Sequence, residues 1–233
     1  MTRALAPALD NPAWSSLTGA HSRFAVVHGL AARYDHEVAP FHALADPADP
    51  LAWNDLAHLV EPDDTVTIAG AGGVAHPGWQ TGHSVGGVQL VDVSLRSSAA
   101  PDAVRLGAAD VPDILDLVDR TQPGPFRRRT VELGTYLGLR SADGRLIAMA
   151  GERLHPHGWT EISAVCTDPA HRKNGLATRL IRAVAAGIRD RGETPFLHTS
   201  AGNVNAIRLY ESIGFVLRAR TDFTAYHRTP PGA

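Results

Sequence analysis

A short glycine-containing turn between an apolar segment and an amphipathic helix carries the residues best suited to chemistry. Arg172, Gly175 and Ala177 fit the pattern Arg/Gln-x-x-Gly-x-Gly/Ala, and Pro169 ends the apolar segment before them. Small residues let the backbone come close to a ligand, and the first free N–H groups of the next helix point at it with the positive end of the helix dipole. An anion such as a pyrophosphate is the natural ligand of this turn.

Two predicted elements hold the turn in place. Residues 161–167 read as an apolar strand, and Arg172 and Lys173 add charge-assisted donors at the rim of the turn. The residues after the turn are apolar at the spacing of one helix face. They are Leu176, Leu180, Ile181, Val184 and Ile188. A short strand at 196–199 follows, and a second helix then bears Tyr210.

Residues 203–215 read Asn-Val-Asn-Ala-Ile-Arg-Leu-Tyr-Glu-Ser-Ile-Gly-Phe. This segment resembles the Asn-x-x-Ala-x-x-Leu-Tyr-x-x-x-Gly-Phe signature region of the GCN5-related N-acetyltransferase (GNAT) superfamily, with Asn205 directly before Ala206. The run Val-Cys-Thr-x-Pro-x-x-Arg-x-x-Gly-x-Ala at 165–177 resembles the acetyl-CoA motif of the same superfamily. Because both motifs occur in the correct order and at a plausible distance, the resemblance is specific.

The resemblance covers residues 103–227 and implies an α+β fold, the GNAT fold, in which helices flank a mixed, mostly antiparallel central sheet. The sequence agrees with the superfamily's order of elements. We expect a helix opened by Asp110 with Pro112 in its first turn, a helical turn at 131–134, and a hairpin at Asp143-Gly144. The expected strands are 103–107, 135–140, 146–153, 215–220 and 223–227, the last two forming a hairpin.

The first hundred residues are expected to form an additional N-terminal α/β domain. Helices are predicted at 17–34 and 53–60, and strands at 65–69 and 88–95. The small and polar residues at 97–101 indicate a linker. We therefore divide the chain into an accessory domain, 1–100, compatible with a degenerate GNAT-like half, and a catalytic GNAT domain, 101–233.

The resemblance implies direct transfer of an acetyl group from acetyl-CoA to a primary amine, without a metal. An amine with a pKa near that of lysine, about 10.4, must first lose a proton, so a base or a water-linked base must face the acceptor. Glu161 lies where the histone-acetylating branch of the superfamily carries its catalytic glutamate. Glu152, on the neighbouring strand, is the alternative base.

The resemblance also assigns the remaining steps. A backbone N–H at Val165 or Cys166 is expected to bind the oxyanion, and Tyr210 to protonate the leaving thiolate. Asn205 is expected to contact the pantetheine arm or to fix the helix start. The residues expected to bind acetyl-CoA are Val165, Cys166, Thr167, Arg172, Lys173, Asn174, Gly175, Leu176, Ala177, Thr178 and Asn205.

Other motifs indicate other functions less strongly. Gly70–Ala75 fits a dinucleotide fingerprint, but Pro77 and Gly78 exclude the helix that it needs. Residues 82–86 fit the hydrolase pattern Gly-x-Ser-x-Gly, but no helix follows, so we read both motifs as loop glycines. His155 and His157 are close in sequence but belong to a proline-containing turn, which favours a surface loop over a zinc site.

The basic run 127–129 is either an acceptor contact or a solvated surface. Cys166, the only cysteine, is expected to be a small core residue, and it cannot form an internal disulfide, which is consistent with a reducing compartment.

Composition is that of a globular enzyme. The chain has 233 residues, of which 44% are hydrophobic and 20% charged, and its net charge of -2 argues against a nucleic-acid binder. No apolar run is long enough for a membrane span. We expect a cytoplasmic monomer or homodimer that acts on a small-molecule or peptide amine. The alternative is a catalytically silent acyl-CoA-binding sensor or interaction domain.

Overall fold

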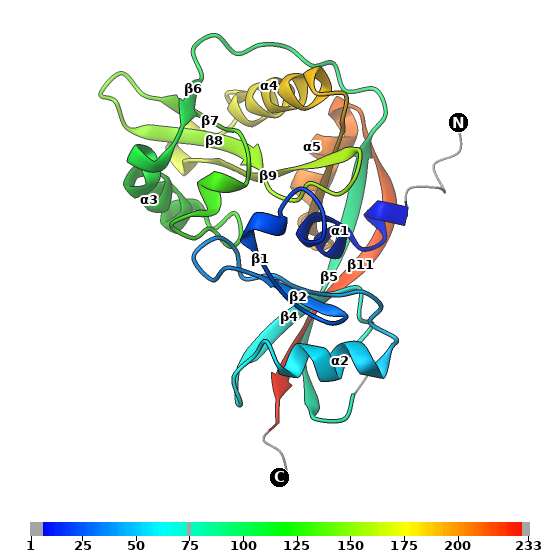
Figure 1. Cartoon of the computed structure of the whole chain (residues 1–233). Helices are drawn as coiled ribbons and strands as arrows, with labels where there is room; N and C mark the ends of the chain where they lie inside the picture. Colours follow the sequence, from blue (N-terminus) through cyan, green and yellow to red (C-terminus); the bar gives the residue numbers. More distant parts are fainter. Residues whose placement is uncertain (1–6, 74–75, 230–233) are drawn as a thin grey trace.

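A computed structural model describes residues 7–73 and 76–229 of the chain, and a large twisted sheet is its main feature (Figure 1). The sheet has eight strands in the order β4-β11-β5-β10-β9-β8-β7-β6. A smaller antiparallel sheet has the order β1-β2-β3. The strands are β1 (Ala25–His28), β2 (Ala31–Tyr34), β3 (His42–Leu44), β4 (Thr65–Ala69), β5 (Trp79–Asp92), β6 (Val104–Leu106), β7 (Tyr136–Arg140), β8 (Leu146–Glu152), β9 (Trp159–Thr167), β10 (Thr194–Ser200) and β11 (Phe215–Arg228).

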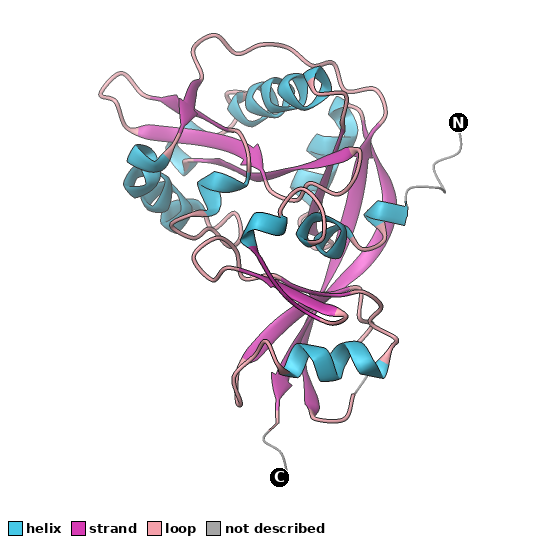
Figure 2. Ribbon diagram, in the orientation of Figure 1, coloured by secondary structure: helices cyan, strands magenta, loops and turns pink. Residues whose placement is uncertain are grey.

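Helices cover both faces of the large sheet (Figure 2). They are α1 (Pro12–Leu17), α2 (Pro50–Ala57), α3 (Val111–Thr121), α4 (Leu176–Asp190) and α5 (Val204–Ile213). Ile147 packs in the same hydrophobic cluster as α4, while its neighbour Leu146 packs in the cluster of α3. Since adjacent strand residues point to opposite faces, α3 and α4 lie on opposite sides of the sheet. The mixed sheet flanked by helices confirms the predicted α+β GNAT fold.

Local sequence explains the two helices that follow the motif strand. The apolar face of α4 is buried as its spacing predicts, from Leu180 to Ile188. Asn203 caps α5 by accepting a hydrogen bond from the N–H of Ala206 at 3.2 Å. Gly214 ends α5 with φ 114°, and a Cβ atom there would lie 2.5 Å from the backbone nitrogen of Leu95, so only glycine fits.

The predicted helix at 17–34 is wrong. Most of this segment forms the hairpin of β1 and β2, which turns at Gly29 with φ 51°. The carboxylate of Asp55 accepts a hydrogen bond from the N–H of Leu30 at 2.7 Å and so fixes this turn. A contact from α2, distant in sequence, therefore stabilises a hairpin that the apolar spacing did not predict.

The predicted hairpin at 215–227 is also wrong. One continuous strand, β11, runs through residues 221–222 and pairs with β5 from Phe215↔Asp92 to Arg228↔Trp79. Bulges after Leu217 and Thr224 let the two long strands twist together. Residues 82–86, which we expected in a loop, lie within β5. Val74 and Ala75 of the dinucleotide-like motif lie outside the described residues.

Strands from both sides of residue 100 share the large sheet. β5 pairs with β10 and β11, and β4 pairs with β11. The connector at 97–101 therefore does not separate two sheets, and the division of the chain at residue 100 stays a prediction about folding units. Figure 1 shows β5 and β11 running together past α5 toward the end that carries α2.

Candidate active site

The site is built where β9 and β10 separate. Their parallel pairing runs only from Thr194↔Trp159 to Phe196↔Glu161. β10 continues to Ser200 with only its other edge paired, to β5, so among the described strands residues 162–167 of β9 have no partner on the β10 side. Ala164 has φ 52°, and the register between β8 and β9 shifts between Met149 and Gly151. This irregularity bends β9 beside the gap.

A cavity of about 1160 Å³ fills the separation. Its wall includes residues 162–167 of β9, residues 121–125 at the end of α3 and just after it, and Asn203, Asn205 and Tyr210 of the α5 region. The charged residues in the described wall are three arginines, Arg127, Arg153 and Arg172, and this wall contains no aspartate or glutamate. The cavity therefore suits a large ligand that carries negative charge.

The turn before α4 has the features of an anion site. Lys173 and Gly175 have φ 66° and 71°, and Gly175 begins α4 without a side-chain cap. The first N–H groups of α4, on Leu176, Ala177 and Thr178, have no partner within the helix. The glycine N-cap thus leaves donors available to a phosphate at the positive end of the helix.

The strand end holds this turn rigidly. Asp168 forms an ion pair with Arg120 of α3 and accepts a hydrogen bond from the N–H of Ala170 at 2.9 Å. The side chain of Arg172 donates to the carbonyl oxygen of Thr167 at 3.2 Å. The guanidinium of Arg172 is therefore fixed beside the cavity.

The predicted cofactor-binding residues fall into two groups. Val165, Cys166, Thr167, Arg172 and Asn205 line the cavity. The rest lie in the adjoining turn and first turn of α4, outside the cavity wall. They are Lys173, Asn174, Gly175, Leu176, Ala177 and Thr178.

Tyr210 lies on the cavity wall and is 8% exposed. Burial raises the pKa of its phenol to about 12. Its ring packs edge to face on Phe215, with centroids 6.2 Å apart. The phenol therefore keeps its proton at neutral pH and faces the same space as β9.

Glu161 is fully buried and is not among the residues that line the larger cavity. Arg153 donates to its two carboxylate oxygens from Nε at 2.8 Å and from Nη2 at 2.6 Å, and Nδ1 of His198 lies 2.8 Å from Oε1. Burial alone would raise the pKa of this carboxyl, but Arg153 and His198 outweigh burial and hold the pKa far below its ordinary range. Such a carboxylate is a weak base.

The alternative base lies elsewhere. Glu152 is 2% exposed, accepts from the N–H of Thr135 at 3.1 Å and pairs with Arg191 at 2.9 Å. It is absent from the walls of both cavities described here. Cys166 is buried, and burial raises the pKa of its thiol, as expected for a core residue.

A polar network that the motifs did not predict continues from Glu161. Nε2 of His198 lies 3.1 Å from Nε2 of Gln89, whose Oε1 accepts from Arg218 at 2.9 Å. Gln89 also donates to the carbonyl oxygen of Leu9 at 2.9 Å, which fixes its amide. His198 therefore accepts from Gln89 and donates to Glu161. Strand register, not sequence spacing, brings these residues together.

A second cavity of about 300 Å³ opens beside the first. The two cavities share Phe41, Thr67, Arg153, His198 and Phe223 in their walls. In the larger cavity, Arg127 is the member of the basic run 127–129 that lines the wall, while Arg129 pairs with Asp35 and Glu132. The two cavities therefore adjoin at these shared residues, among them Arg153.

Comparison with known proteins gives the family. Residues 136–224 match the family model of FR47-like proteins. A GNAT-family protein of known structure from Novosphingobium aromaticivorans is 39% identical, has a TM-score of 0.85, and aligns over 95% of this chain and 99% of its own. The chain belongs to the GNAT superfamily. Within this superfamily, a GCN5-related N-acetyltransferase from Kribbella flavida shares the fold, with 17% identity, a TM-score of 0.59 and 96% of each chain covered.

A mycothiol acetyltransferase from Thermomonospora curvata is 34% identical to this GNAT protein over 96 residues. The match covers 41% of this chain and 31% of that enzyme, so the chain spans under a third of the relative's length. In the part of the chain that the structure describes, no helix is long and apolar enough to cross a membrane.

Proposed function

We propose that this protein is an N-acetyltransferase that moves an acetyl group from acetyl-CoA to a primary amine. The separation of β9 from β10 carries the proposal, because it opens a cavity along an unpaired strand edge. An extended amide-containing arm such as pantetheine finds hydrogen-bonding partners along such an edge. The uncapped start of α4, with Arg172 beside it, supports binding of the pyrophosphate there.

The transfer needs a donor for the oxyanion and a donor for the leaving sulfur, and we assign both to groups of this site. The amine nitrogen attacks the thioester carbonyl, and a backbone N–H at Val165 or Cys166 stabilises the oxyanion. As the C–N bond forms and the C–S bond breaks, the phenol of Tyr210 donates a hydrogen bond to the leaving sulfur, which takes up a proton as coenzyme A departs. The proton lost by the amine goes to a base or to water.

For that proton we propose a water-mediated route. The carboxylate of Glu161 is engaged by Arg153 and His198 and is absent from the walls of both cavities. Glu161 then acts by holding these two residues at the junction of the cavities. The larger cavity's wall, without acidic side chains, favours an uncharged amine at the reaction site.

Release of free thiol from acetyl-CoA across a panel of amines tests the proposal. An acetyltransferase releases thiol with at least one amine at a rate above hydrolysis. The alternative, a silent acyl-CoA-binding domain, predicts binding of acetyl-CoA without amine-dependent release. The free, buried Cys166 supports a reducing compartment, so we propose a cytoplasmic location. We further propose that the protein acts as a monomer or homodimer and without a metal.

A further inference from the structure

The smaller cavity offers room for a small molecule beside the reaction site. Its volume of about 300 Å³ lies at the lower end of ligand pockets. Residues 9–13 around the start of α1, β3 with its neighbours, and residues 218–223 of β11 enclose it. The first hundred residues therefore supply most of the wall of a space that adjoins the larger cavity.

The charges in this wall disfavour a polycationic acceptor. The wall contains Arg153, Arg218 and Arg220 but two aspartates, Asp10 and Asp222. Asp10 is paired with Arg218 at 2.5 Å, and Asp222 accepts from a backbone N–H and a threonine hydroxyl. Arg218 neutralises Asp10, whereas the donors to Asp222 are uncharged, so the three arginines outnumber the two aspartates in the described wall and disfavour a second ammonium group on the acceptor.

Arg153, at the junction, presents a fixed donor. Its Nε and Nη2 are held by the fully buried Glu161, and its guanidinium lies over the ring of Phe41 at 5.0 Å. No hydrogen bond within the described residues uses Nη1, although the side chain is 16% exposed and lines both cavities. The orientation of this guanidinium is therefore set before any ligand arrives.

We propose that the acceptor is a small amine that also carries a carboxylate, such as an amino acid or a molecule ending in one. Its carboxylate binds the Nη1 side of Arg153, and its amine extends into the larger cavity toward the thioester. This inference rests on the proposed acetyltransferase function and names its substrate class. Arg153 then determines specificity, while Glu161 positions it.

The test compares amino acids with the matched amines that lack the carboxylate, using thiol release from acetyl-CoA. Loss of a charge-assisted hydrogen bond predicts kcat/KM higher by about tenfold to a hundredfold for the amino acids. Arg153→Lys keeps the charge but loses the planar guanidinium fork. The ratio of kcat/KM for the amino acid to that for the matched amine should therefore fall toward one, through a higher KM for the amino acid. Arg140→Lys, which alters an arginine paired with Asp110 and Asp113, should keep the full preference.

Wild-type protein supplies an independent measurement. Carboxylic acids that match the preferred acceptor but lack the amine should inhibit competitively against it, and the corresponding amides should not. Equal kcat/KM for both amine classes, preference for polyamines, or an unchanged preference in Arg153→Lys would overturn this inference alone. If none of the amines tested caused release of thiol above the rate of hydrolysis, the proposed function itself would be contradicted.

Discussion

Tyr210 and Glu161 show how environment decides what a residue can do. Burial raises the pKa of Tyr210 to about 12, whereas Arg153 and His198 overcome burial and lower the pKa of Glu161. A thiol has a pKa near 8.5, so full transfer from such a phenol to a thiolate is uphill. A hydrogen bond to the departing sulfur is therefore the larger part of the proposed role of Tyr210.

Removing the phenolic hydroxyl tests this role. Tyr210→Phe keeps the ring that packs on Phe215 but removes the donor, so acetyl-CoA binding should persist while kcat falls by about a hundredfold. Calorimetry with acetyl-CoA and steady-state kinetics measure the two effects. Equal loss of binding and turnover would mean that Tyr210 is structural.

The substitution Glu161→Gln distinguishes a structural role of Glu161, as the ion-pair partner of Arg153, from a role as catalytic base. The substitution leaves the Arg153 guanidinium without its buried counter-charge, so the free energy of unfolding should fall by about 3 kcal/mol in urea denaturation. The control Glu132→Gln removes a partner from an exposed ion pair, so it should lower the free energy of unfolding by under about 1 kcal/mol. Unchanged stability with loss of the acidic limb of the pH–rate profile would instead make Glu161 the base.

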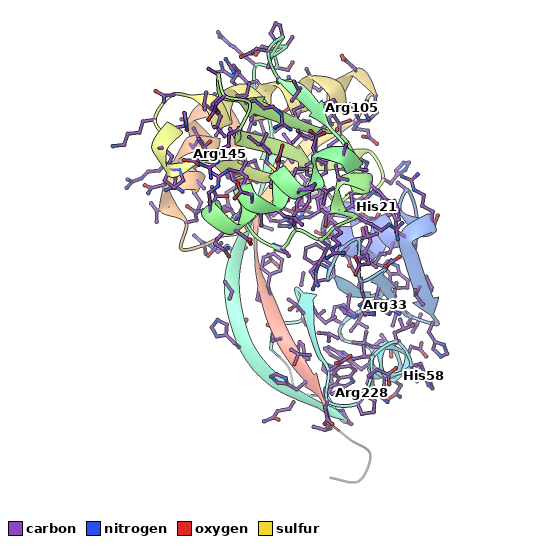
Figure 3. All side chains as sticks on the ribbon, turned by 90° about the vertical axis from the view of Figure 1, so that its left-hand side faces the viewer. His21, Arg33, His58, Arg105, Arg145 and Arg228 are labelled. Atoms are coloured by element: carbon purple, nitrogen blue, oxygen red, sulfur yellow. The ribbon has the colours of Figure 1, made fainter. Side chains whose placement is uncertain are left out.

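His21 should make stability depend on pH. It lies where the N-terminal segment meets the larger part of the molecule (Figure 3), 3.2 Å from the carbonyl oxygen of Leu133. Burial, then the nearby charge of His155, lower its pKa from 6.5 to about 4. As the pH falls, the imidazole of His21 takes up a proton in the unfolded chain before it does so in the folded one. The free energy of unfolding should therefore decrease by about 3 kcal/mol between pH 6.5 and pH 4.

The measurement is urea denaturation at several pH values between 4 and 7. His21→Gln cannot titrate, so its stability should fall less steeply with pH than that of the wild type. Burial also lowers the pKa of His42 to about 4, so the free energy of unfolding of His21→Gln should still depend partly on pH. Identical slopes for variant and wild type would exclude His21 as a source of the effect.

Among the helices and strands, the sequence predicted correctly those whose formation depends on neighbouring residues in the chain. The strand at 65–69, the hairpin at Asp143-Gly144 and the apolar face of α4 follow from turn chemistry and periodicity. The hairpin of β1 and β2 and the full length of β11 depend on Asp55 and on β5, which are distant in sequence. For the same reason Arg153 and His198 escaped prediction, because strand register alone places them beside Glu161.

The whole molecule depends on strands from both halves of the chain. β5 lies between β10 and β11. Its removal would expose the edge of each strand that pairs with β5, together with the apolar residues beneath. A truncated chain that begins at Pro101 should therefore lack a cooperative unfolding transition by circular dichroism. Cooperative unfolding of that chain, with a thermal shift in acetyl-CoA, would establish residues 101–233 as a separate catalytic domain.

The account depends most on acetyl-CoA binding at the start of α4, and the thermal shift of two glycine variants measures it directly. Gly175 and Gly158 have similar φ values, 71° and 77°, and a Cβ atom at either meets nothing within 4 Å, so the backbone strain of a substitution is matched. Acetyl-CoA at about 100 times its dissociation constant should stabilise the wild type and Gly158→Glu by about 2.7 kcal/mol. Gly175→Glu should show no shift, because its carboxylate would repel the pyrophosphate. A shift of full size in folded Gly175→Glu, or none in the wild type, would contradict the account.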